Sequence, residues 1–285
     1  MNRALDGKVV LITGATEGVG KAAALELARQ GAKLVLVGRN PEKTQRVVSE
    51  VQNVASHPVE QIIADMSSMA DVRRVAKEFL AKHDRLDVLA NNAGALVNDY
   101  ILSADGFEMT FALNHMGYFL LTAELLNVLK KTPGARIIST SSGAHNSGRI
   151  DLETFVKRNG RAGFSAYTAS KLANILFTRE LARRIEGSGV VANCFHPGFV
   201  RTGFGVSNKD ILGKAIGVVA SIFGRTPEKG AETLVWLATS EEGGRVSGQY
   251  FFNNKVAKIS KRAQDDVMAK KLWELSERLA AKQAS

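Results

Sequence analysis

A tyrosine and a lysine four positions apart, Tyr167 and Lys171, are the residues of this chain best suited to acid–base chemistry. On a helix this spacing places both side chains on one face, one turn apart. A free tyrosine has a pKa near 10, but a cation about 4 Å away, at an effective dielectric of about 20, favours the phenolate by roughly 4 kcal/mol, or about 3 pKa units. The pair could therefore exchange a proton near neutral pH. The same spacing also occurs on solvated helix faces, so the pair needs a reactive partner beside it.

The elements that must position this pair are indicated by short apolar runs that alternate with longer helix-patterned segments. The apolar runs predict seven strands, at residues 9–12, 33–37, 61–64, 86–90, 135–140, 190–195 and 248–252. Helices are expected at residues 18–31, 41–54, 71–82, 105–129, 164–186, 226–239 and about 262–281. Strands that are apolar on both faces and alternate with helices are typical of a parallel sheet covered on both sides. We therefore expect an α/β fold in which residues 1–285 form a single-domain, doubly wound parallel sheet of Rossmann-like type.

The composition of the 285 residues is that of a soluble globular protein, with 45% hydrophobic and 23% charged residues. The net charge of +10 could serve nucleic acid or an anionic membrane surface, but no basic-aromatic groove pattern accompanies it. A solvated basic surface, or attraction for an anionic cofactor, is favoured instead. The single cysteine, Cys194, excludes an intrachain disulfide and is expected in the core. Neither a signal sequence nor a run of about 18 apolar residues is found, which predicts a cytoplasmic protein without a transmembrane segment.

A glycine-rich turn, Thr13-Gly-Ala-Thr-Glu-Gly-Val-Gly20, joins the first predicted strand to the first predicted helix. Small residues at such a turn let the backbone approach a pyrophosphate closely, at the positive end of the helix. An ordinary tight turn could carry the same glycines. Their position inside a βαβ unit nevertheless favours a dinucleotide site that includes Gly14, Gly18 and Gly20.

The residues after the second predicted strand bear on the choice between NAD(H) and NADP(H). An acidic residue there would bind a ribose 2′-hydroxyl, whereas this chain has Arg39, which suits a 2′-phosphate. Arg39 could instead be a surface residue lying over the adenine. Glu17, in the glycine-rich turn, could repel a phosphate or pair with Arg39. We predict that NADP(H) is preferred and that NAD(H) is possible.

Further motifs follow the later strands in order. Asn91-Asn-Ala-Gly94 comes after the run at 86–90, and Asn114 lies on the predicted helix at 105–129. Ser142 stands just past the run at 135–140. Together with the glycine-rich turn, the Tyr167–Lys171 pair, Pro197-Gly198 and Thr202, this set resembles the short-chain dehydrogenase/reductase family over nearly the whole chain. Residues 170–183 and the sequence His196-Pro-Gly look most like its retinol-dehydrogenase-like branch.

The resemblance implies four catalytic residues. Tyr167 would transfer the proton, and Lys171 would hold the nicotinamide ribose and lower the pKa of the tyrosine. Ser142 would hydrogen-bond the substrate oxygen, and Asn114 would position a water that links Lys171 to solvent. Hydride transfer to a carbonyl leaves an alkoxide that needs a hydrogen-bond donor and a proton, which Ser142 and Tyr167 can supply. The implied cofactor contacts are Gly14, Thr16, Gly18, Val19, Gly20, Arg39, Asp65, Asn91, Ala93, Gly94, Tyr167, Lys171, Pro197, Gly198, Val200 and Thr202.

Three of these contacts have specific implied partners: Asp65 the adenine, Asn91 the adenosine ribose, and Pro197 with Thr202 the nicotinamide. No metal is implied, because the five histidines show no ligand spacing. Each histidine is expected to be structural, or a loop residue.

Two segments are expected to shape the substrate pocket. The segment 143–164 is polar, and 203–224 contains an interrupted apolar run that we interpret as a mobile lid over an apolar carbonyl or alcohol substrate. Core packing, or an interfacial patch assisted by the basic C-terminal helix, are alternative interpretations of this run. The resemblance also implies a homodimer or homotetramer that pairs through the helices at 105–129 and 164–186.

Other functions on the same fold stay open. An epimerase or dehydratase could use the same tyrosine and lysine, and a non-catalytic cofactor sensor could keep the glycine-rich turn alone. The combination of Ser142, Tyr167, Lys171 and Asn114 argues against a sensor. No Gly-x-Ser-x-Gly motif surrounds Ser142, which argues against a serine hydrolase.

Overall fold

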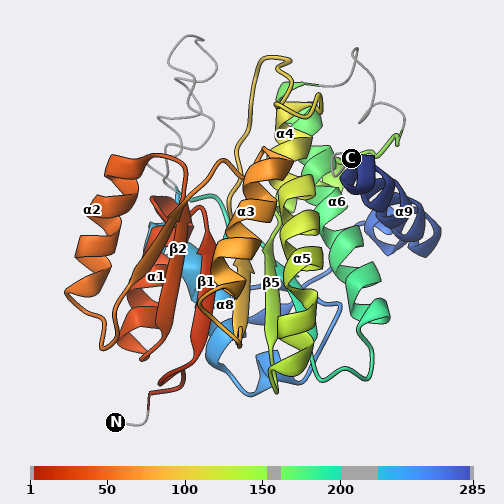
Figure 1. Cartoon of the computed structure of the whole chain (residues 1–285). Helices are drawn as coiled ribbons and strands as arrows, with labels where there is room; N and C mark the ends of the chain where they lie inside the picture. The colour runs from red at the N-terminus through yellow and green to blue at the C-terminus, as the bar shows by residue number, and fades with distance from the viewer. Residues whose placement is uncertain (1–2, 153–161, 201–223, 283–285) are drawn as a thin grey trace.

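A computed structural model describes residues 3–152, 162–200 and 224–282 as one twisted sheet with helices on both faces (Figure 1). The sheet has eight strands in the order β3-β2-β1-β4-β5-β6-β7-β8. The first seven run parallel and β8 runs antiparallel to β7. The strands are β1 Val9–Thr13, β2 Lys33–Gly38, β3 Glu60–Ile63, β4 Val88–Asn91, β5 Arg136–Thr140, β6 Val191–Phe195, β7 Tyr250–Phe252 and β8 Lys255–Val256. The predicted α/β fold with a doubly wound, mainly parallel sheet is confirmed.

Alternate side chains of the strands point into two separate cores. In β1, Val9 and Leu11 belong to the core under α3, α5 and α6, while Val10 and Ile12 belong to the core under α1, α2 and α8. This is why the strand is apolar at every position, as a sheet buried on both faces requires. The long helices are α1 Gly18–Arg29, α2 Pro41–Gln52, α3 Met69–Leu80, α5 Gly117–Lys131, α6 Gly163–Arg184, α8 Pro227–Thr239 and α9 Asp266–Lys282.

The helix expected at 105–129 is more complex than its sequence pattern indicates. A short α4, Met109–Phe111, is capped by the buried Glu108, whose carboxylate accepts hydrogen bonds from the backbone N–H groups of Thr110 and Phe111. A π-helical turn, η1 Ala112–Met116, then leads into α5. A π turn carries one extra residue and is frequent at functional sites. Asn114 lies in this turn.

The strand β8 is absent from the seven strands that the sequence predicts. The turn before it contains Asn253 and Asn254, whose φ angles are 50° and 61°. Two successive positive φ angles are what a tight two-residue hairpin needs, and asparagine tolerates them better than most residues. The Asn-Asn pair was therefore the signal for this hairpin.

The C-terminal helix α9 packs mainly against α6, on the side away from the centre of the sheet (Figure 1). Its Trp273 ring lies 4.9 Å from Phe119 of α5 and 5.8 Å from Phe177 of α6, between ring centroids. Near its end, the carbonyl of Ala280 accepts a hydrogen bond of 2.7 Å from Arg73 of α3. α9 thus covers part of the face through which pairing of two chains is predicted, and that pairing stays a prediction.

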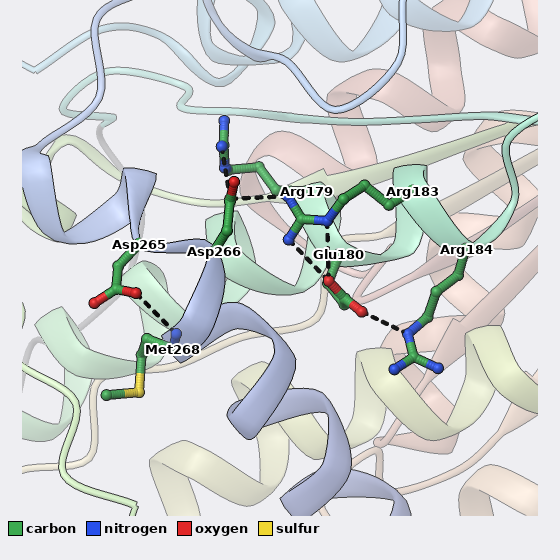
Figure 2. A network of polar contacts seen from close by, with 7 residues as sticks. All are labelled: Arg179, Glu180, Arg183, Arg184, Asp265, Asp266 and Met268. Atoms are coloured by element: carbon green, nitrogen blue, oxygen red, sulfur yellow. Dashed lines mark hydrogen bonds and ion pairs between the residues drawn. The ribbon is translucent and has the colours of Figure 1, made fainter.

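An ionic network fixes the start of α9 on α6 (Figure 2). Asp266 accepts hydrogen bonds from Arg179 at 2.9 Å and from Arg183 at 2.8 Å. Arg183 and Arg184 also bind the largely buried Glu180, and the Arg184 guanidinium lies 4.5 Å from the centroid of the Trp273 ring. The acidic first turn of α9 is therefore held by basic side chains of α6.

The predicted lid at 203–224 lies outside the described residues except for its last one, as does the middle of the predicted pocket segment 143–164, at 153–161. Among the helices that the structure describes, none is long and apolar enough to cross a membrane.

Candidate active site

Tyr167 and Lys171 project from the first half of α6 toward the carboxyl end of β5. The Lys171 ammonium nitrogen lies 5.7 Å from the centroid of the Tyr167 ring. It donates a hydrogen bond of 3.1 Å to the carbonyl of Thr140, the last residue of β5. Lys171 is only 2% exposed. The helical spacing therefore brings the two side chains together, as the sequence predicts.

The charge state of the pair differs from the expectation. Burial lowers the pKa of Lys171 to about 7. Burial also raises the pKa of Tyr167 above its ordinary value of 10, while a hydrogen bond with Ser142 acts in the opposite direction. The sequence argument counted the attraction between ammonium and phenolate but not the water that both groups lose, and desolvation favours the neutral form of each. At neutral pH the tyrosine is therefore a protonated phenol.

Ser142 reaches the same place from the end of β5. Its backbone is extended, and its hydroxyl accepts a hydrogen bond of 3.2 Å from the Ala144 N–H, which caps a short 3₁₀ helix, η2 Gly143–Ser147. The hydroxyl is also hydrogen-bonded to Tyr167. Ser142 and Tyr167 thus present two polar groups side by side, as a site for a carbonyl or hydroxyl oxygen requires.

Asn114, in the π turn, is fully buried and connects the loop after β4 to α6. Its side-chain oxygen accepts from the Ala95 N–H at 2.9 Å, and its amide donates to the Ala95 carbonyl at 2.9 Å. The amide also donates to the hydroxyl of Ser170 at 3.0 Å, which in turn donates to the Tyr167 carbonyl at 2.8 Å. A side chain at Gly94 would lie 3.1 Å from the Asn114 oxygen and 3.4 Å from the Lys171 nitrogen. Gly94, Asn114 and Lys171 therefore line the same side of the candidate site.

The glycine-rich turn is packed against the loop after β4. Gly14 has a φ of 65°, and a Cβ there would lie 2.6 Å from the Ala93 Cα. A Cβ at Gly20 would lie 2.6 Å from the side-chain nitrogen of Asn92. That same nitrogen donates to the carbonyls of Thr13, at 3.1 Å, and Gly14, at 3.2 Å. Small residues are needed here for the two loops to touch.

The N-terminus of α1, like those of α5 and α6, has no side-chain cap. A side chain caps the start of α2 (Asn40), α3 (Ser68) and α8 (Thr226), whereas no side chain caps α1. The first N–H groups of a helix without such a cap can bind an anion. Gly18, Val19 and Gly20 form this first turn.

Two ion pairs lie near the ends of β2 and β3, at the place predicted for the adenosine. Arg39, whose side chain is 76% exposed, lies 3.8 Å from Asp65. Glu17 lies 3.9 Å from Lys43 rather than pairing with Arg39. Lys43, in the first turn of α2, adds a second cation that the sequence analysis did not single out.

The remaining predicted contacts divide into four groups. Thr16 borders Gly38, where an added Cβ would lie 2.5 Å from its methyl group. Pro197, Gly198 and Val200 follow β6, and Gly198 donates a backbone hydrogen bond of 3.0 Å to His196. The Asn91 side chain is turned into the core, where it donates to Thr122 of α5 at 2.9 Å, so a ribose contact by Asn91 would have to come from its backbone. Thr202 lies outside the described residues.

Comparisons with known proteins identify the family of this chain. A family model described as short chain dehydrogenase matches residues 8–210. The chain belongs to the short-chain dehydrogenase family. It is 38% identical over 289 residues to retinol dehydrogenase 14 of Homo sapiens, covering 96% of this chain and 86% of that protein. Similarity of this kind places it in the retinol-dehydrogenase-like branch, and it is an oxidoreductase acting on CH–OH or C=O groups.

Solved structures of other proteins are similar in fold to this dehydrogenase. An uncharacterised protein from Mycobacterium paratuberculosis matches with a TM-score of 0.77 and 33% identity, covering 97% of this chain and 96% of that one. A short chain dehydrogenase from Burkholderia cenocepacia, solved in complex with NADP, has a TM-score of 0.71 and 27% identity, covering 88% and 97% of the two chains.

The residues of this dehydrogenase fit a nicotinamide dinucleotide. The α1 N-terminus has no side-chain cap, and Gly14 packs so closely on Ala93 that a side chain there would clash. The free backbone N–H groups of this turn could bind the pyrophosphate. Arg39, Lys43 and Asp65 could hold the adenosine end, and Lys171 the nicotinamide end. Among the residues that the structure describes, no cluster of histidine, cysteine or acidic side chains could hold a metal ion.

Sequence reasoning missed several residues that build the site. Asn92 ties the glycine-rich turn to the loop after β4, and Asn174 donates to the same Thr140 carbonyl as Lys171, at 3.1 Å. His145 holds the Ser142 carbonyl: its Nε2 accepts from the Ser260 N–H at 3.3 Å, so its Nδ1 carries the proton and donates to Ser142 at 2.8 Å. The helical spacing of Asn174 from Lys171 was a usable signal, but nothing local indicated the role of His145.

Proposed function

We propose that this dehydrogenase transfers a hydride between NADP(H) and the carbonyl or alcohol carbon of an apolar substrate, with Tyr167 as proton donor and acceptor. The observation that carries the proposal is that Ser142, Tyr167 and Lys171 lie close together beside Gly94. Gly94 follows Ala93, against which the glycine-rich turn packs. When bound, the dinucleotide supplies or accepts the hydride.

The residues of the chain have separate roles in carbonyl reduction. The Ser142 hydroxyl donates a hydrogen bond to the substrate oxygen and stabilises the negative charge that develops there. The Tyr167 phenol, which is protonated at neutral pH because burial raises its pKa, then gives its proton to the new alkoxide. Lys171, whose pKa burial lowers to about 7, stands close enough to stabilise the phenolate that remains. In the reverse direction the phenolate accepts the proton of the alcohol.

The preference for NADP(H) is supported by charge at the end of β2. Arg39 and Lys43 are both largely exposed and each has one carboxylate partner within 4 Å, at 3.8 Å and 3.9 Å. A 2′-phosphate could replace those weak surface pairs with stronger charge-assisted hydrogen bonds. The NADP bound to the Burkholderia cenocepacia protein adds support.

An apolar substrate is supported by exposed aromatic side chains around the site. Phe164 is 61% exposed and lies 6.4 Å from the Tyr167 ring, between centroids. Phe199, which is 52% exposed, follows the Pro197-Gly198 turn. Exposed apolar side chains gathered near a reactive group favour binding of an apolar ligand. The names of the retinol dehydrogenase relatives point to the same class, an apolar alcohol or its carbonyl.

The test is NADPH oxidation by the purified protein against a panel of aldehydes and ketones of increasing apolar length. We expect turnover with the longer members, and a loss of about 100-fold to 10,000-fold in Tyr167→Phe. Ser49→Ala, which removes an exposed hydroxyl far from the site, is the control and should be unchanged. Failure of every carbonyl and alcohol to react with either dinucleotide would refute the proposal.

A further inference from the structure

His115 is a buried polar residue next to Asn114 that the mechanism above does not use. It is 1% exposed and lies in the π turn. Its ring stacks on Phe111 at 5.2 Å and meets the edge of Phe177 at 6.0 Å, between ring centroids. Its Nε2 lies 3.0 Å from the hydroxyl of Ser276, which comes from α9. A polar ring in such apolar surroundings needs a reason, because burying it costs free energy unless it is hydrogen-bonded.

His115 has hydrogen-bond partners on two helices. Its Nε2 contacts the Ser276 hydroxyl of α9, which also donates to the Leu272 carbonyl at 2.8 Å. Burial lowers the pKa of His115 to about 4, and a hydrogen bond with Asn174 of α6 acts in the opposite direction. The ring is therefore neutral at neutral pH, and its single proton can serve only one of the two contacts as donor. His115 is thus held between α9 and α6.

Ser276 is itself held by contacts that do not involve His115. The start of α9 is bound to α6 through Asp266, as Figure 2 shows, and its middle through Trp273. Its end is bound to α3 through the Ala280 carbonyl. Because three separate contacts define where α9 lies, Ser276 is a fixed hydrogen-bond partner for the histidine.

We propose that His115 is a positioning residue for Asn114, and that α9 completes the active site by holding it through Ser276. An α-helix and a π turn of the same sequence direct their side chains differently, so the extra residue of the turn must be held in place. Fixing the ring of His115 fixes the rotation of the turn. Asn114, one residue earlier, then reaches Ala95 and Ser170 together. The route runs from Ser276 through His115 and Asn114 to Ser170, and from Ser170 to the Tyr167 carbonyl.

The experiment compares three variants with the wild-type chain. Ser276→Ala removes the hydroxyl that His115 contacts, and His115→Phe keeps a ring but removes both ring nitrogens. Thr239→Ala is the matched control, because the Thr239 hydroxyl also donates to a carbonyl one turn earlier, that of Val235 at 2.8 Å, on the unrelated helix α8. Amide hydrogen exchange of residues 112–116 and 93–95 is measured in each, together with kcat and KM.

We expect faster exchange at 112–116 in Ser276→Ala and His115→Phe, with kcat lower by about 10-fold to 100-fold and KM for NADPH unchanged. Thr239→Ala should match the wild type. His115→Gln, whose amide can donate to Ser276, should recover part of both readouts. Unchanged exchange and unchanged kcat in Ser276→Ala and His115→Phe would overturn the proposal. If Ser276→Ala releases α9 altogether, His115→Phe decides alone, since it leaves the contacts of α9 with α6 and α3 intact.

The turnover readout rests on the proposed function, whereas hydrogen exchange does not. A wild-type chain without any dehydrogenase activity would refute the proposed function. The exchange difference between Ser276→Ala and Thr239→Ala would still decide whether α9 orders the π turn.

Discussion

The two ends of the candidate site are built in opposite ways. The glycine-rich turn is made by removing side chains, so that Gly14 and Gly20 can touch the loop after β4. The catalytic end is made by burying side chains that would prefer water, with Asn114 at 0% and Lys171 at 2% exposure. One end therefore depends on space, and the other on hydrogen bonds that offset desolvation.

This difference separates stability from chemistry. A substitution in the glycine-rich turn should harm folding and cofactor binding together, because it disturbs the contact between two loops. A substitution at the catalytic end can improve folding while it abolishes turnover, because the buried amine is held there at a cost in free energy.

The largest effect that would test this comparison is expected from Lys171→Met. Turnover should fall by 1,000-fold or more, about 4 kcal/mol of transition-state free energy. The free energy of unfolding should rise by about 1–3 kcal/mol at neutral pH. The pKa of Lys171, about 7 in the folded chain, lies below its ordinary value of 10.5, so the cost of burying it is greatest below pH 7 and disappears toward pH 10.5. Urea unfolding at neutral and at alkaline pH measures this gain, and a less stable variant at neutral pH would contradict it.

Gly14→Ala is expected to have the next largest effect, in the opposite direction for stability. The added methyl group would meet the Ala93 Cα at 2.6 Å, in a residue whose φ is 65°. We expect the free energy of unfolding to fall by about 2–4 kcal/mol and NADPH binding to weaken. Gly7→Ala is the control, because Gly7 has a φ of 69° but nothing within 4 Å of an added Cβ. Equal losses in both variants, measured by urea unfolding and calorimetry, would show that backbone strain alone is responsible.

Acid pH should weaken the catalytic end through His115. Its pKa is lowered from 6.5 to about 4 in the folded chain, so the unfolded chain binds more protons between these values. Stability therefore falls as pH is lowered from about 6.5 to about 4, by about 2 kcal/mol between pH 7 and pH 5. His115→Phe should show a shallower decline over this range in urea unfolding. The decline that remains is expected from His145 and His196, whose pKa values burial also lowers. A decline as steep as that of the wild type would argue against this assignment.

The smallest effect is expected at the adenosine end. Arg39→Ala should raise KM for NADPH by about 10-fold, or 1.4 kcal/mol, and leave KM for NADH unchanged. Arg29→Ala, at the opposite end of α1 and 3.5 Å from Glu26, is the control. Equal changes for the two dinucleotides would mean that Arg39 contacts the adenine rather than a phosphate.

The sequence predicts the glycine-rich turn better than it predicts the catalytic end. Gly14, Gly18 and Gly20 are read from local spacing, because glycine reports directly on backbone conformation and close approach. The spacing of Tyr167 and Lys171 also predicts their meeting. The sign of their pKa shifts was not predictable, because desolvation depends on the elements that cover them.

Long-range contacts explain what else was missed. His115 and Ser276 are separated by 161 residues, and no pattern near either one indicates the other. The π turn carries no distinctive residues, so the helix at 105–129 was expected to be continuous. The β8 hairpin differs from these cases, since Asn253-Asn254 announced it locally and could have been used.

The position of α9 in the chain has a consequence for biosynthesis. It follows every other described element, so while the chain is being made the rings of Phe119 and Phe177 lack the covering surface of Trp273. This apolar surface is a natural binding site for chaperones and a starting point for aggregation until the helix arrives.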